Sequence, residues 1–351
     1  MNTWLAYKSK RAYVFREYIW GLGHYPWPKE KYLESRPWTP LNALLSGPSA
    51  GGLWDPDDDA PRSISEHWFN TVCPESERRI IFTEDVKPAI YWEMGDVIFK
   101  HWEKLLTEAP ERCIEIQPSI SDITPQTFDL WLWGSTRILP LWEEFKNSPV
   151  SRLVTPSTIV KAAVDRNEYL FLPRGPRPPH PAPRDPYERM LAVHLRRGDY
   201  KDHCIYLANW NSTFYSWNLL PLLPDKFIHP SPEGYQRGQN TPEAIAHYQK
   251  HCYPDHDLIM DKIQKSREEY IQAAKPGKYS LLDVLFLLTN DHTDWVEELK
   301  AKLKESGWYT IVTTKDLELD QEEKDVGLAV DMDFARKAAV FIGNGVSPPL
   351  P

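Results

Sequence analysis

Residues 194–199, with the sequence His-Leu-Arg-Arg-Gly-Asp, carry the side chains best suited to chemistry. The planar guanidiniums of Arg196 and Arg197 each offer several hydrogen-bond donors, an arrangement that suits phosphate or diphosphate oxygens. Gly198 has no side chain, so a ligand can approach the backbone closely there. The run therefore predicts a site for a phosphate-bearing ligand. A solvated turn with an internal pair between arginine and aspartate is the alternative interpretation of the same residues.

The element that must position these side chains is a strand. Residues 190–196 are mostly apolar and of strand length, and they follow the most proline-rich segment of the chain, residues 173–186. We expect a buried parallel strand with polar groups at its carboxyl end, where open α/β sheets bind ligands. Two further predicted strands are followed by polar or small residues, at Asn290, Asp291, Gly343, Asn344 and Ser347. If the sheet is parallel, these strand ends lie along one edge.

Predicted strands and helices alternate along the second half of the chain. Helices are predicted at residues 242–252, 256–274, 294–305 and 326–338, and further strands at residues 280–288, 308–313 and 339–342. Strands that alternate with helices indicate a parallel, Rossmann-like sheet.

The first half also predicts an α/β unit. Its expected strands cover residues 79–83, 113–116 and 168–172, and its expected helices cover residues 95–108 and 128–145. The proline-rich segment excludes both helix and sheet, so it is interpreted as an ordered strap between domains. We therefore expect a first domain over residues 1–172, a linker over 173–187 and a second domain over 188–351.

Composition and charge restrict the possible functions. The 351 residues carry a formal net charge of −9, which argues against general nucleic-acid binding because that requires a basic field. The sequence has no apolar run of ~18 residues, the length that a membrane span needs. Residues 1–11 lack the apolar core of a signal peptide. A ligand phosphate must therefore be met by a local basic site.

Four cysteines, Cys73, Cys113, Cys204 and Cys252, allow three pairings, and none lies in a Cys-x-x-Cys arrangement. We expect the pairs Cys73–Cys113 and Cys204–Cys252, one within each predicted domain, and no zinc site. Asn211 opens an Asn-Ser-Thr glycosylation sequon. An even number of cysteines and a sequon favour a secretory lumen, with four buried thiols in a cytosolic protein as the alternative.

The ordered set of motifs resembles the O-fucosyltransferase and α1,6-fucosyltransferase superfamily. The matching positions are His194, Arg196, Arg197, Gly198, Asp199, Asp331 and residues 341–347. Segments 46–52, 60–72, 131–135 and 166–179 are similar to tryptophan- and proline-rich stretches of fungal members. The resemblance covers nearly the whole chain.

The resemblance implies a GT-B architecture, in which two Rossmann-like domains hold GDP-fucose in the cleft between them. It implies an inverting fucosyltransferase that needs no metal or other cofactor, uses a protein or glycan acceptor, and lies in the secretory pathway, in the Golgi or ER lumen. Arg196 would contact the β-phosphate and stabilise the departing GDP, and Asp331 would lie near the guanine. The other implied substrate-binding residues are His194, Arg197, Gly198, Asp199, Gly343, Asn344 and Ser347. An acidic residue would deprotonate the acceptor hydroxyl, but no residue of the sequence is assigned that role.

Two elements of the family pattern have no counterpart in this chain. One is a glycine-rich turn before the first helix, and the other is a second serine and a helix after Ser347, where Pro348 stands instead. The missing elements suggest a fragment or a degenerate relative. A catalytically inactive relative that binds a sugar nucleotide or a glycan is therefore the alternative to an active enzyme.

Two other classes of protein are weighed on single motifs. Asp331 and Asp333 are spaced as in a metal-dependent transferase, but they lie inside a predicted helix instead of at a strand end. The tripeptide Arg197-Gly198-Asp199 is that of an adhesion ligand, but it follows a buried strand and is expected to be poorly exposed.

Overall fold

The computed structural model describes residues 1–21, 27, 30, 37–119, 126–176, 183, 185–198, 200–230, 240–274, 280–291 and 293–344. The chain divides into two compact units. The first comprises Met1–Ile159 and Phe214–Lys226, and the second comprises Val160–Thr213 and Phe227–Pro351. This division differs from the expected boundary after residue 172, because the second unit already begins at Val160 and the chain returns to the first unit over Phe214–Lys226.

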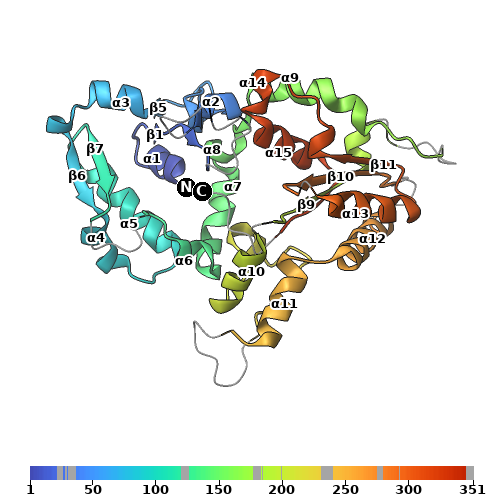
Figure 1. The fold of residues 1–351 in the computed structure, drawn as a ribbon. Helices are drawn as coiled ribbons and strands as arrows, with labels where there is room; N and C mark the ends of the chain where they lie inside the picture. The colour runs from blue at the N-terminus through green and yellow to red at the C-terminus, as the bar shows by residue number, and fades with distance from the viewer. Residues whose placement is uncertain are drawn as a thin grey trace. The chain divides into compact units, whose positions relative to one another are not determined.

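The second unit is built on a four-stranded parallel sheet (Figure 1). Its strands are β9 (Met190–Leu195), β10 (Val284–Thr289), β11 (Thr310–Thr313) and β12 (Val340–Ile342), in the order β11-β10-β9-β12. The chain places its first three strands side by side in one direction and then crosses back to put β12 on the far side of β9. A doubly wound α/β sheet has this order in its first four strands. The predicted parallel sheet is therefore confirmed.

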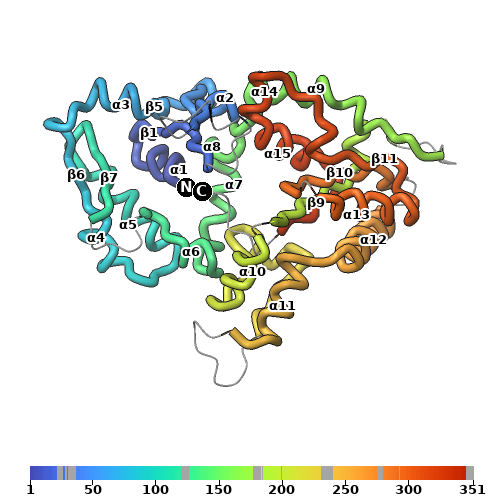
Figure 2. The backbone as a smooth tube through the Cα atoms, in the orientation of Figure 1, coloured from blue at the N-terminus to red at the C-terminus, as the bar shows by residue number. Residues whose placement is uncertain are grey.

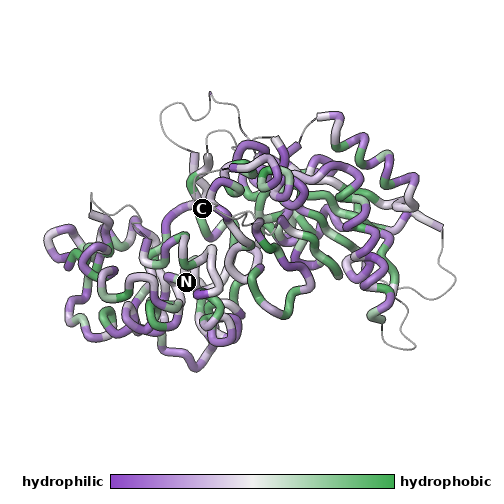
Figure 3. The backbone as a smooth tube through the Cα atoms, turned by 90° about the horizontal axis from the view of Figure 1, so that it is seen from below, coloured by the Kyte–Doolittle hydropathy of each residue, from purple (hydrophilic) through white to green (hydrophobic). Residues whose placement is uncertain are grey.

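The central strands β9 and β10 are buried on both faces of the sheet, which explains why they are almost continuously apolar. Leu191, Val193 and Leu285 belong to a core that also includes residues of α12 (His256–Gln272) and α13 (Asp294–Glu305). On the opposite face Phe286 contacts Phe171 and Phe334, with ring centroids 5.4 and 5.7 Å away. Figures 1 and 2 show α12 and α13 on one side of the strands and α15 (Gly327–Lys337) on the other. The apolar stretches are green in Figure 3.

The first unit has smaller sheets among its described residues. The strands pair as β1 (Val14–Phe15) with β5 (Ile64–Ser65) and β6 (Arg79–Phe82) with β7 (Ile114–Gln117), both parallel, and as β2 (Tyr18–Ile19) with β3 (Trp38–Thr39) and β4 (Leu45–Ser46) with β8 (Thr155–Pro156), both antiparallel. Its core is formed where α1 (Asn2–Lys8) packs on α5 (Gly95–Glu108): Trp4 lies on Phe99 with ring centroids 4.1 Å apart. Trp217, from the returning segment, stacks on Phe145 of this unit with centroids 5.7 Å apart.

The remaining elements are short or cover these cores. The other α-helices are α2 (Leu41–Leu44), α3 (Glu66–Val72), α4 (Thr83–Val86), α6 (Leu130–Trp133), α7 (Trp142–Asn147), α8 (Pro149–Arg152), α9 (Thr158–Asn167), α10 (Tyr200–Asn209), α11 (Pro242–Cys252) and α14 (Gln321–Lys324). The described 3₁₀ helices cover Pro48–Ala50, Glu75–Glu77, Lys87–Ile90, Thr136–Leu141, Glu168–Phe171, Pro186–Arg189, Ser216–Leu219 and Thr314–Asp316.

Two predicted elements of the first half are wrong. The strand expected at residues 168–172 is a 3₁₀ turn that directly continues α9, and its Phe171 is fully buried. An apolar run this short does not distinguish strand from helix. The single helix expected at residues 128–145 is broken into α6, a 3₁₀ segment and α7, because the chain turns at Gly134 and carries Pro140 inside the second piece.

The proline-rich strap is described only in part. Residues 177–182 and 184 lie outside the described residues, and Pro186 begins the 3₁₀ turn that leads into β9.

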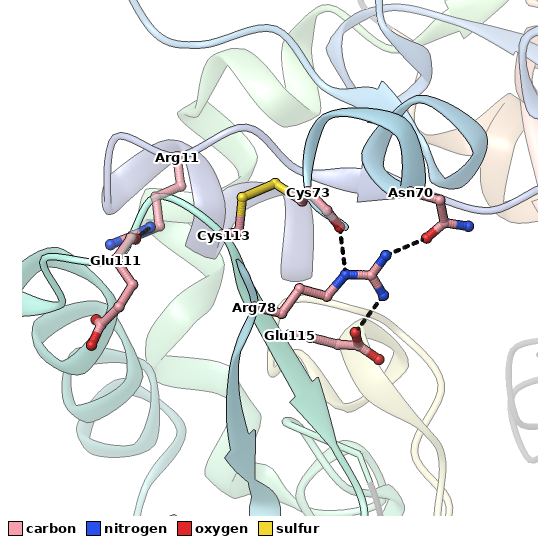
Figure 4. The surroundings of a disulfide bond; sticks show 7 residues. All are labelled: Arg11, Asn70, Cys73, Arg78, Glu111, Cys113 and Glu115. Atoms are coloured by element: carbon pink, nitrogen blue, oxygen red, sulfur yellow. Dashed lines mark hydrogen bonds and ion pairs between the residues drawn. A yellow bond between two sulfur atoms is a disulfide. The ribbon is translucent and has the colours of Figure 1, made fainter. Parts of the chain in front are cut away.

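Each unit contains one of the two expected disulfides. Cys73–Cys113 joins the end of α3 to the start of β7 in the first unit, and Cys204–Cys252 joins α10 to the end of α11 in the second. Figure 4 shows how Arg78 supports the first of them. Its Nε donates to the carbonyl of Cys73 at 2.7 Å, and its two terminal nitrogens donate to Glu115 and Asn70, both at 2.8 Å. No cysteine is free.

Candidate functional site: the carboxyl edge of the parallel sheet

The carboxyl ends of the strands define one edge of the sheet in the second unit. The connections run from β9 through β10 to β11 in one direction, and the connection to β12 runs in the other, so the direction reverses between β9 and β12. In open α/β sheets a crevice forms at this point, outside the carboxyl ends of the strands. Arg196 follows β9 and Gly343 follows β12, so the predicted motifs flank the reversal.

Arg196 is the more exposed of the two arginines. It is half-buried, and its guanidinium carbon lies 4.8 Å from the centre of the Tyr200 ring at the start of α10. A cation over an aromatic ring is attracted by the negative face of that ring. Arg196 is therefore held at the strand end in an orientation set by α10.

Arg197 faces a different environment, with only 8% of its surface exposed. Its guanidinium lies between the rings of Tyr253 and Trp295, at 3.8 and 3.9 Å, and its Nη1 donates to the carbonyl of Pro254 at 2.8 Å. Burial lowers the pKa of Arg197, and its Nε has no hydrogen-bond partner among the described residues. This guanidinium supports the strand end, and the interpretation that both arginines offer their donors to a phosphate does not fit it. The same burial removes support for the adhesion-ligand interpretation.

The turn after β9 is fixed by the neighbouring strand. The Arg197 amide donates to Oδ1 of Asn290 at 2.8 Å, and Nδ2 of Asn290 donates back to the Arg197 carbonyl at 3.3 Å. Gly198 then adopts a positive φ of 62°, which favours glycine, and a Cβ added there would lie 4.0 Å from Asn290 Nδ2. Asp199 lies outside the described residues. The sequence therefore brings Asn290 to Arg197, as expected from adjacent parallel strands.

Asp291 and His194 complete the part of the edge formed by β9 and β10. Burial alone would raise the pKa of Asp291, but hydrogen bonds from Thr293, at 2.7 Å from both its amide and its hydroxyl, help lower it. Burial and the nearby charge of Arg196 lower the pKa of His194, so its imidazole is neutral near pH 7. Asp291 is thus a carboxylate that accepts hydrogen bonds from Thr293, the residue that caps α13, and His194 adds no positive charge to that of Arg196.

Asp331 reaches the same edge from α15. Its Oδ2 accepts a hydrogen bond of 2.9 Å from the hydroxyl of Thr314, the residue that follows β11. Its Oδ1 is buried without a hydrogen-bond partner in the described part of the chain. Burial raises the pKa of Asp331 to about 7, partly opposed by the Thr314 hydrogen bond. A carboxyl group so placed can accept or donate a hydrogen bond near neutral pH.

The positions of Asp331 and Asp333 do not support a metal site formed by these two carboxylates. Asp333 is buried and paired with Arg336, 2.6 Å away, and with Lys337, 3.8 Å away, whereas Asp331 bonds to Thr314. The two carboxylates therefore engage different partners. Over the described residues, no three His, Cys, Asp or Glu side chains are grouped to hold a metal ion.

Asn344 marks the end of β12. Its Nδ2 donates to the carbonyl of Cys252 at 3.3 Å, while its buried Oδ1 has no partner among the described residues. A Cβ at Gly343 would lie 2.9 Å from the Phe341 ring, so a side chain there requires that ring to move. Ser347 lies outside the described residues.

Several residues of this edge were not predicted from sequence. Tyr200, Trp295 and Thr314 lie in the first turn of an α- or 3₁₀ helix, and Tyr253 directly follows the end of α11, so no periodic pattern marks these residues. Asn211, the predicted glycosylation position, follows α10 with a positive φ of 50°, and its Oδ1 is buried.

No family model matches the chain, and no curated protein sequence matches it significantly. Within the described residues no helix is both long and apolar enough to cross a bilayer.

Proposed function

We propose that the carboxyl edge of the second unit binds the diphosphate of a sugar nucleotide. One observation carries the proposal: Arg196 stands at the end of β9, beside the reversal between β9 and β12, with its guanidinium lying against Tyr200. A chain with a net charge of −9 needs such a local cation to hold a phosphate group. The resemblance of the motifs to fucosyltransferases favours GDP-fucose as the donor.

The proposed reaction is an inverting fucosyl transfer in a GT-B architecture with two Rossmann-like domains and a donor cleft between them. An acceptor hydroxyl oxygen of a protein or glycan bonds to the anomeric carbon while the bond from that carbon to the β-phosphate oxygen breaks. The bonding electrons leave on GDP, and the hydroxyl proton passes to a carboxylate base that is not assigned. Arg196 stabilises the charge on the leaving diphosphate, and loss of one such donor typically raises the barrier by about 3 kcal/mol.

Asp331 is proposed to bind the base of the nucleotide. Its Oδ1 has no hydrogen-bond partner in the described part of the chain, and guanine offers N–H donors of the kind this oxygen accepts. His194 and Arg197 have supporting roles in this proposal, because one is a neutral ring beneath the edge and the other is enclosed by aromatic rings.

The experiment is isothermal titration of GDP and GDP-fucose into the full chain and two variants. Arg196→Ala should weaken binding about 100-fold, since charge-assisted hydrogen bonds contribute roughly 2–3 kcal/mol. Arg174→Ala is the matched control, because Arg174 is an exposed arginine of the same unit, outside the proposed site. Equal affinity of the two variants for GDP would contradict the proposal.

Turnover decides between an enzyme and a binding protein. The second candidate is a relative that binds a sugar nucleotide without transferring it, and it is favoured by the fact that Asp291 and Asp331 both already accept threonine hydrogen bonds. Incubation of GDP-fucose with candidate protein and glycan acceptors should release GDP if the chain is a transferase. Tight binding without GDP release would support the second candidate.

A further inference from the structure

Several side chains that contact Arg197 support the carboxyl end of β9, and a disulfide connects them to α10. The guanidinium of Arg197 contacts two aromatic rings, with its central carbon 3.8 Å from the centre of the Tyr253 ring and 3.9 Å from that of Trp295. The ring of His256 extends this group, with its centroid 4.4 Å from that of Trp295, and its Nε2 lies 3.0 Å from the Trp295 carbonyl oxygen. We call Arg197, Tyr253, Trp295 and His256 the aromatic clamp.

The aromatic clamp is tied covalently to the helix that carries Tyr200. Tyr253 and Pro254 directly follow Cys252, which is cross-linked to Cys204 in α10. The carbonyl of Cys252 also accepts the hydrogen bond from Asn344 at the end of β12. The single residue Cys252 therefore connects α10, the aromatic clamp and the end of β12.

The chain between the two cysteines makes this cross-link important. It leaves the second unit after Thr213 and returns at Phe227, so α10 and α11 are separated by a segment that belongs to the first unit. Without the disulfide, the end of α11 would be linked covalently to α10 only through that long excursion. The disulfide gives Tyr253 and Pro254, which contact Arg197, a second covalent connection to α10 that does not depend on the chain between the two cysteines.

We infer that the Cys204–Cys252 disulfide and the aromatic clamp are positioning elements for the proposed nucleotide site. They fix the backbone of residues 196–198, and with it the direction of the Arg196 guanidinium, although none of them needs to touch the ligand. The inference rests on the proposed function for its binding readout, but its geometric content is independent of the ligand.

The chain supplies a matched control for the disulfide. Cys73–Cys113 closes a sequence separation of 40 residues and Cys204–Cys252 one of 48, so loss of either removes nearly the same chain-entropy term. In Cys204→Ser/Cys252→Ser, deuterium exchange at the amides of residues 195–198 should become faster than in Cys73→Ser/Cys113→Ser. GDP affinity should fall about 10-fold in the first variant, the loss expected when a cation–π clamp is loosened, and less than about 2-fold in the second.

A milder pair of variants covers the case in which the first double variant does not fold. Tyr253→Leu removes one face of the aromatic clamp, and Tyr253→Phe keeps the ring. Amide deuterium exchange at residues 195–198 should be faster in Tyr253→Leu than in the wild-type chain, and should have the wild-type rate in Tyr253→Phe.

The possible outcomes separate this inference from the proposed function. Equal exchange at residues 195–198 in the two double-cysteine variants, or in the two Tyr253 variants if the first fails to fold, would overturn the positioning role even if GDP binds. Faster exchange in the predicted variants, with no GDP binding to the wild-type chain, would uphold the positioning role and contradict the proposed ligand.

Discussion

Arg189 and Asp283 form an ion pair at the amino edge of the sheet, directly before β9 and β10. Nε of Arg189 lies 2.8 Å from Oδ1 of Asp283, its Nη2 contacts Oδ2, and the side chains are only 10% and 14% exposed. The amide of Asp283 also donates to the Arg189 carbonyl at 3.2 Å. The two strands are therefore fixed in register at the end opposite to the proposed site.

Removal of one member of this pair should destabilise the second unit strongly. Arg189→Met leaves the Asp283 carboxylate buried without its partner, and such changes cost about 3–5 kcal/mol. Urea denaturation should show this loss in the free energy of unfolding. The double variant Arg189→Met/Asp283→Leu should recover most of the stability, because it removes both charges of this ion pair. A double variant as unstable as the single one would contradict this account.

The buried carboxyl group of Asp331 should make stability depend on pH. Its pKa is raised from 3.8 to about 7 in the folded chain, so the folded state retains a proton that the unfolded chain releases. Stability should therefore decrease as the pH rises from about 4 to about 7 and change little from this group above that. The total loss is of the order of 2–4 kcal/mol.

Urea midpoints measured between pH 4 and 8 test this dependence. Asp331→Asn keeps the size of the side chain and cannot ionise, so its stability should lack the decrease that wild type shows. Parallel pH profiles for the two proteins would show that Asp331 does not titrate in this range.

The core on the α15 side of the sheet should depend on Phe171. This residue is fully buried, with ring centroids 4.5 Å from Phe334 and 5.4 Å from Phe286. Phe171→Ala should lower the free energy of unfolding by about 3–5 kcal/mol, as expected for a large cavity. Leu172→Ala, at a neighbouring side chain that is 52% exposed, should cost less than about 0.5 kcal/mol. Thermal unfolding of both variants measures the difference.

The sequence predicts the second unit better than the first, for a physical reason. β9 and β10 are buried on both faces and α11, α12 and α13 have clear patterns and caps, so local signals and final packing agree. The predicted helix at residues 294–305 is confirmed, and Thr293 is its capping residue. In the first unit, short segments depend on contacts with distant residues, and the apolar run at 128–145 gives no sign of where it breaks. Helix α10 was missed because its polar and apolar residues show little periodicity.

The candidate site was only partly accessible to sequence reasoning. The motif identifies which strand end carries the arginines, and the parallel sheet brings Asn290 to Arg197. The separate roles of Arg196 and Arg197 depend on Tyr253 and Trp295, which lie 56 and 98 residues after Arg197 along the chain and reach it only after folding. The sequence next to Arg196 and Arg197 does not indicate which of the two guanidiniums is covered by aromatic rings.

The return of the chain to the first unit over Phe214–Lys226 has a consequence for dissecting the molecule. Neither unit is a continuous stretch of sequence, and Trp217 contributes an aromatic side chain to the first unit's packing. One proteolytic cut therefore releases neither unit intact. A fragment that begins at Val160 would lack the residues of the first unit that cover Trp217. Trp217 and its neighbours would then be exposed to water, and the fragment would be prone to aggregate. Independent expression of the second unit requires Thr213 to be joined to Phe227 by a short linker, and the excised segment has to be supplied back to the first unit.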